Sequence, residues 1–70
     1  MKAEFKVILL LIGMGEEIRF ENLEERAKKE KFNGSVIETL RSMEKNGLVT
    51  MKTSSCKKTA RGIEKTKKLL

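Results

Sequence analysis

The 70-residue sequence contains no histidine, aspartate, glutamine, proline, tryptophan or tyrosine, and it has a single cysteine. One cysteine cannot form an internal disulfide, and without histidine the chain lacks the second common ligand of structural zinc. We therefore expect no disulfide framework, no metal and no other cofactor. General acid–base chemistry is left with glutamate, lysine and one thiol, and no phosphate-binding loop is present, so we do not expect an enzyme.

Aromatic residues and long apolar runs are also scarce. All three aromatic residues are phenylalanine, so no tyrosine or tryptophan is available for the bases of single-stranded nucleic acid to stack on. The apolar run Val7–Ile12 is far shorter than the ~20 residues that span a bilayer. Glu4 interrupts the segment before it and no small-residue cleavage site follows, so we expect a mature cytoplasmic chain without a membrane segment.

Positive charge is concentrated in one part of the chain. Residues 1–27 carry four basic and six acidic side chains, whereas residues 28–70 carry twelve basic and four acidic ones. A basic surplus confined to one region is typical of a surface that binds a polyanion. The alternative is that these lysines only solvate the surface of a small domain.

Hydrophobic spacing predicts one domain, residues 1–70, with a mixed but mostly helical structure. The expected helices are Glu4–Ile12, Asn22–Phe32, about 34–46 and 60–70, with a short strand at Glu17–Phe20 and a hairpin at about 48–58. Asn22 and Glu25 have the layout of a capping box for the second helix, and Thr59 suits the N-cap of the last. In that last helix we expect Ile63 and Leu70 to face inward.

Two patterns predict buried positions. Val36, Leu40 and Met43 recur at the spacing of one buried helix face. Cys56 falls where the second hairpin strand would point inward, opposite Met51, and we interpret it as a small buried apolar residue. Redox sensing or a disulfide between subunits is the alternative for this thiol.

Three stretches, in this order, resemble the winged helix-turn-helix superfamily. "RFENL" (Arg19–Leu23) is similar to its strand-to-helix junction, "VIETLRSMEKNGLV" (Val36–Val49) to the recognition helix running into the wing, and "KTARGIEKTKKLL" (Lys58–Leu70) to the Thr-x-x-Gly opening of the helix after the wing. The resemblance is closest to small prokaryotic regulators of the MarR, PadR, HxlR and ArsR type. It implies an α+β, mostly α, fold: a three-helix core, a small β-hairpin wing and a C-terminal helix.

The resemblance also implies a function: sequence-selective binding of double-stranded DNA by a small transcriptional regulator, in the simplest case a repressor. The recognition helix, about 34–46, would enter the major groove, and the basic wing, about 48–58, would touch the backbone or minor groove. The candidate DNA-binding residues are Asn33, Ser35, Glu38, Thr39, Arg41, Ser42 and Lys45, with Lys28, Lys52, Lys57 and Lys58. We expect the wing to present its three lysines together at the tip.

Other features leave alternatives open. Glu38 places a carboxylate where the resembled families often carry a basic or neutral residue, which favours a protein–protein interaction or architectural module without specific DNA reading. Lys58 replaces a residue that is usually apolar in those families, so the second hairpin strand is expected to be short or frayed. The spare apolar face of the first helix predicts a homodimer, with an interface made by the first and last helices. The candidate interface residues are Val7, Leu10, Leu11 and Leu70.

Overall fold

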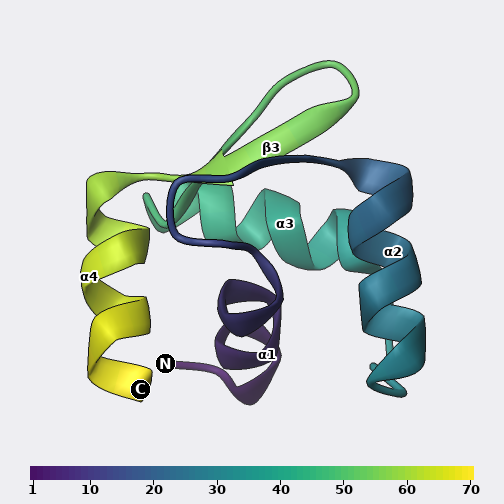
Figure 1. Ribbon diagram of the computed structural model, residues 1–70, viewed down its shortest axis with the longest axis horizontal. Helices are drawn as coiled ribbons and strands as arrows, with labels where there is room; N and C mark the ends of the chain where they lie inside the picture. The colour runs from purple at the N-terminus through teal and green to yellow at the C-terminus, as the bar shows by residue number, and fades with distance from the viewer.

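Four helices and a three-stranded antiparallel sheet make up the chain, so the fold is α+β and mostly helical, as predicted (Figure 1). The computed structural model describes all 70 residues. Its elements are α1 (Ala3–Leu11), β1 (Glu17–Arg19), α2 (Phe20–Lys29), α3 (Val36–Lys45), β2 (Val49–Met51), β3 (Ser55–Lys58) and α4 (Ala60–Leu69). None of these helices combines the length and apolar character needed to cross a membrane.

The sheet has the strand order β1–β3–β2, so β3 is the central strand. The predicted hairpin is present, and Met51 lies opposite Cys56 as expected. Ile18 of β1 lies opposite Cys56 from the other side, a pairing that the sequence pattern did not predict. The hairpin extends beyond the helices at one end of the molecule, over α3 and toward α2 (Figure 1).

The hydrophobic core surrounds α1, which contacts α2, α3 and α4 (Figure 1). Burial of a large aliphatic side chain contributes roughly 1.5–3 kcal/mol, so this cluster is the main source of stability. The predicted inward face of α3 and the predicted burial of Cys56 are both confirmed. The core consists of Phe5, Ile8, Leu9, Ile12, Ile18, Leu23, Ala27, Val36, Leu40, Met43, Leu48, Val49 and Cys56.

The predicted capping box at Asn22 and Glu25 is wrong. The chain passes from β1 into α2 without a loop, so the helix begins at Phe20 and both residues lie inside it. The start is fixed by the sheet, because the Phe20 backbone N–H donates to the Ser54 carbonyl of the hairpin at 3.0 Å. A helix start that depends on a distant strand has no local sequence signal.

The starts of the other two long helices have side-chain caps. Ser35 caps α3, and its Oγ accepts a hydrogen bond of 3.2 Å from the Glu38 backbone N–H. Thr59 caps α4 as predicted, accepting from the Gly62 backbone N–H at 3.1 Å. Such a cap contributes about 1 kcal/mol and sets the residue at which each helix begins.

The first turn of α4 packs closely on the backbone of Leu48, the residue before β2, and Gly62 makes this close packing possible. A Cβ atom at this position would lie 2.1 Å from the Leu48 carbonyl oxygen. The Thr-x-x-Gly pattern therefore has two physical roles: Thr59 starts the helix, and Gly62 lets its first turn approach the backbone. Small residues take the inward positions of this helix.

Leu70 does not face inward, contrary to the prediction for the last helix. It follows the end of α4 and is 85% exposed, whereas Gly62 and Thr66 are the buried positions. Ile63 and Leu69 are half-buried, so the expectation for Ile63 is met only in part. Because α4 approaches the backbone closely at Gly62, its small residues face the core in place of the predicted Ile63 and Leu70.

We expect Gly62→Ala to lower the free energy of unfolding by about 2 kcal/mol or more, because the new methyl group would overlap the Leu48 carbonyl. Gly15→Ala is the matched control, since a Cβ there has no neighbour within 4 Å. Urea unfolding followed by circular dichroism measures both values. Equal stability of the two variants would contradict the close approach of α4.

Candidate nucleic-acid interface

The outward face of α3 combines two cations with polar groups. At 100° per residue, Glu38, Arg41, Ser42 and Lys45 lie opposite the buried face of the helix. Three of them are exposed and Ser42 is half-buried. Arg41 and Lys45 take part in none of the chain's ion pairs, so both are available to phosphates or base edges. We call these four residues the α3 face.

Residues around the start of α3 are more committed to the helix itself. The Ser35 hydroxyl accepts the capping bond, and the Thr39 hydroxyl donates to the Ser35 carbonyl at 2.8 Å. Thr39 is also half-buried, at the edge of the α3 face. Asn33 is exposed in the preceding loop. Of these three predicted contacts, only Asn33 has a side chain free of local hydrogen bonds.

Glu38 has a structural reason for its position. It lies in the first turn of α3, three residues after the Ser35 cap. A carboxylate there interacts favourably with the positive end of the helix dipole, by roughly 0.3–1 kcal/mol. The residue that weakened the DNA hypothesis at sequence level therefore also stabilises the helix start.

The hairpin presents fewer free lysines than predicted. Lys57 is exposed in the middle of β3, between Thr50 and Glu17 on the neighbouring strands. Lys52 is exposed but pairs with Glu17, its Nζ lying 3.0 Å from Oε1. The Ser55 hydroxyl donates to the other oxygen of Glu17 at 2.8 Å, and these two contacts lower the pKa of the carboxyl, Ser55 more than Lys52. Lys57 is therefore the one unpaired lysine of the hairpin surface.

Lys58 is not a surface residue, which corrects its assignment as a DNA contact. Its side chain is 5% exposed and crosses the core side of the sheet. The Nζ atom donates to the Leu9 carbonyl at 3.0 Å and to the Thr66 hydroxyl at 3.1 Å, with Met14 Sδ at 3.9 Å. β3 is short, as expected, but it continues through Lys58 and is not frayed there.

The last turn of α1 has no basic residue of its own. Cationic side chains from other elements donate hydrogen bonds to the carbonyl groups at this C-terminal end. Besides Lys58 on Leu9, Arg26 of α2 donates to the Leu11 carbonyl at 2.8 Å. The same guanidinium forms a bidentate pair with Glu16, at 2.8 and 2.9 Å. Arg26 is the main cause of the lowered pKa of Glu16. These contacts bind α1 to α2, β3 and α4.

The remaining predicted residues lie on other elements than α3 and the hairpin. Lys28 is exposed in the last turn of α2, where a cation also suits the helix dipole. Among the candidate interface residues, Leu10 and Leu70 are exposed, whereas Val7 and Leu11 are half-buried and Leu11 packs on the core. The spare apolar face of α1 is therefore smaller than expected, and the dimer stays a prediction.

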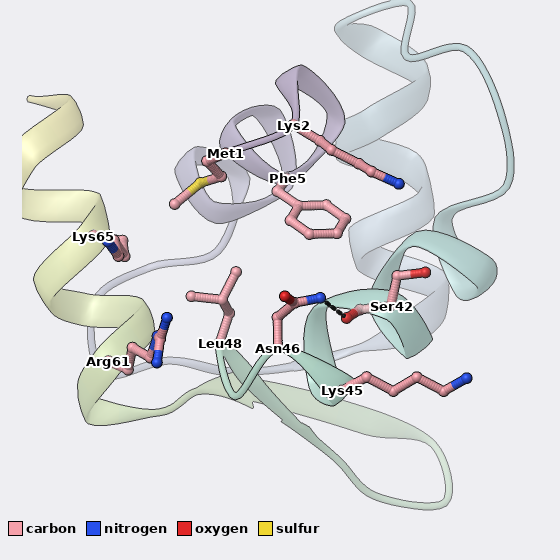
Figure 2. A pocket seen from close by; sticks show the side chains of 9 residues that line it. All are labelled: Met1, Lys2, Phe5, Ser42, Lys45, Asn46, Leu48, Arg61 and Lys65. Carbon is pink, nitrogen blue, oxygen red and sulfur yellow. Dashed lines mark hydrogen bonds between the residues drawn. The ribbon is translucent and has the colours of Figure 1, made fainter.

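A second basic surface was not predicted. A cavity of about 660 Å³ lies between the start of α1, the last turn of α3 and the first half of α4 (Figure 2). Lys45 of the α3 face borders it together with Lys2, Arg61 and Lys65. The i, i+4 spacing of Arg61 and Lys65 shows that they share a helix face. Their proximity to Lys2 and Lys45 depends on the tertiary structure.

Comparison of the chain with models of protein families, with curated proteins and with solved structures gives no match. No group of three or more histidine, cysteine, aspartate or glutamate side chains is placed to hold a metal ion. The site is therefore interpreted from its own geometry: an exposed helix face with two free cations, followed by a hairpin with one free lysine.

We expect Lys58→Ala to lower the free energy of unfolding by about 2–3 kcal/mol, because it removes a buried stem and its hydrogen bonds to α1 and α4. Lys57→Ala is the matched control and should stay within about 0.5 kcal/mol of the parent. Chemical denaturation at neutral pH measures both. Similar losses in the two variants would show that the Lys58 contacts contribute little.

Cys56 should make stability fall at alkaline pH. Burial raises the pKa of its thiol from 9.0 to about 11. Between these values the unfolded chain releases the proton and the folded chain retains it, so rising pH favours unfolding, by up to about 2–3 kcal/mol. The stability advantage of the parent over Cys56→Ala should shrink from about pH 8 to pH 11. An advantage that is constant with pH would contradict this.

Proposed function

We propose that this chain is a winged helix-turn-helix protein that binds double-stranded DNA through the α3 face. The observation that carries the proposal is the exposure of Arg41 and Lys45, both unpaired, on the helix that directly precedes the projecting hairpin. The order of elements and the strand order β1–β3–β2 support it, because they agree with the arrangement that the three sequence stretches resemble.

The proposed roles follow from side-chain chemistry. Arg41 donates two parallel hydrogen bonds to a guanine edge, which provides sequence selectivity. Lys45 and Lys57 neutralise backbone phosphates and release counterions, which provides most of the affinity. Ser42, with one hydroxyl, can bond either a base edge or a phosphate. Glu38 accepts from a cytosine amino group or excludes the backbone from its end of the helix.

The regulatory role is part of the same proposal. A homodimer would place two α3 helices on half-sites about 10 bp apart or a multiple of that distance. Leu10, which is 50% exposed on α1, is the apolar side chain best placed for the contact between copies. Such a dimer occupying a promoter would act as a repressor by excluding other proteins, in the cytoplasm of its source cell.

The second candidate is a protein-interaction module on the same fold. The exposed carboxylate of Glu38, beside the half-buried Ile37, is the observation that favours it. An apolar side chain next to a carboxylate suits a basic protein surface better than a phosphate backbone. The two functions differ in their response to salt and to duplex DNA.

Binding to a duplex library, measured by fluorescence anisotropy over a salt series, tests the proposal. We expect Arg41→Ala to lose about 1–3 kcal/mol of discrimination between preferred and random duplexes. Lys57→Ala should weaken binding to all sequences and reduce the magnitude of the salt slope by about 1. Lys68→Ala, an exposed lysine of α4, is the control and should leave both quantities unchanged. Absence of binding at low salt would favour the second candidate.

A further inference from the structure

Four cationic side chains border the cavity beside α3, and they come from three separate elements. Lys2 precedes α1, Lys45 ends α3, and Arg61 and Lys65 lie one turn apart on α4 (Figure 2). No carboxylate lines the cavity, although the chain has ten glutamates. The three ion pairs of the chain involve other basic residues, so none of these four cations has a carboxylate within salt-bridge distance.

Four cations without a carboxylate among them make the mouth of the cavity electropositive. Like charges around a concave surface reinforce one another, and the low-dielectric wall focuses their potential into the cavity. A bound phosphate would accept charge-assisted hydrogen bonds, which are roughly twice as strong as neutral ones. Arg61 can supply two parallel donors to a phosphate.

The cavity also has an apolar part. Met1, Phe5 and Leu48 line it, and the Lys2 ammonium lies 5.8 Å from the centre of the Phe5 ring. Its volume of about 660 Å³ is within the range of small-molecule sites, roughly 300–1,000 Å³. Cations at the rim and apolar side chains between them match a ligand with an anionic group and an apolar body.

We propose that this cavity binds a small organic phosphate, with the phosphate held by Arg61 and Lys65 and the apolar body against Met1 and Leu48 (Figure 2). A compact group with two negative charges can contact both of these cations at once. A duplex presents singly charged phosphates along a convex surface, which suits the exposed α3 face better than a concave site.

The position of the cavity implies a regulatory consequence. Ser42 and Lys45 belong to both the α3 face and the cavity lining. A ligand in the cavity would therefore lie beside Ser42 and Lys45 of the DNA-binding surface, and the ligand and the duplex would compete. This consequence rests on the proposed function, whereas binding of the phosphate itself does not.

Isothermal titration with phenyl phosphate, without DNA, tests the proposal. We expect the Arg61→Ala/Lys65→Ala variant to bind at least about tenfold more weakly than the parent, because two charge-assisted contacts are lost. Lys67→Ala/Lys68→Ala removes the same charge from exposed positions of the same helix that lie outside the cavity, and should change the affinity by less than about twofold. Inorganic phosphate should bind about fivefold more weakly than phenyl phosphate, since it lacks the apolar body.

Two results would overturn this inference: no saturable binding of phenyl phosphate by the parent, or an equal loss of affinity in both double variants. Inorganic phosphate binding as tightly as phenyl phosphate would overturn the role of the apolar lining. A Lys2→Ala/Lys45→Ala variant provides a second probe from other elements, and circular dichroism confirms that each variant is folded. If the parent protein binds phenyl phosphate but no DNA duplex, the proposed function fails and binding of the phosphate in the cavity stands.

Discussion

The Lys58 ammonium is the contact on which the mutual positions of α1, α4 and the sheet depend. It is buried on the core side of β3, where it donates to a carbonyl near the end of α1 and to the Thr66 hydroxyl of α4. Thr66 in turn donates to the Gly62 carbonyl at 2.8 Å, so the network continues to the turn of α4 that meets the Leu48 backbone. Burial lowers the pKa of Lys58, which reflects the energy needed to hold a charge among apolar neighbours. The hydrogen bonds offset that energy only if all three elements are in place.

Acidic and basic side chains are also distributed unevenly over the surface. Three glutamates at the surface bond to other parts of the chain: Glu16 to Arg26, Glu17 to Ser55 and Lys52, and Glu44 to the Met51 backbone N–H at 3.0 Å. Each of these carboxylates joins two elements of the fold. The cations of α3 and the first half of α4 take part in none of the chain's ion pairs. The fold therefore separates the acidic residues that connect its elements from the basic residues that remain free for an anionic partner.

Features that depend on local chemistry were predicted well. The spacing of Val36, Leu40 and Met43 identified the buried face of α3, and Thr59 was identified as a cap from its hydroxyl and position. The Met51–Cys56 register followed from alternation along a short hairpin. Contacts between distant segments were not predicted. Asn22 had the chemistry of a cap, but a hydrogen bond from Phe20 to the hairpin started α2 earlier. Lysine is usually a surface residue, and the burial of Lys58 is explained only by the acceptors that α1 and α4 place near its ammonium.

The sequence by itself determined the order and type of the elements, the inward face of α3 and the concentration of positive charge after residue 27, because these depend on spacing and composition. Only the tertiary structure decided which basic residues are free. It buried Lys58, paired Lys52 with Glu17, left Arg41 and Lys57 exposed, and brought Lys2, Lys45, Arg61 and Lys65 around one cavity. The physical reason is that the availability of a charge depends on its neighbours in space, which residues far apart in the chain provide.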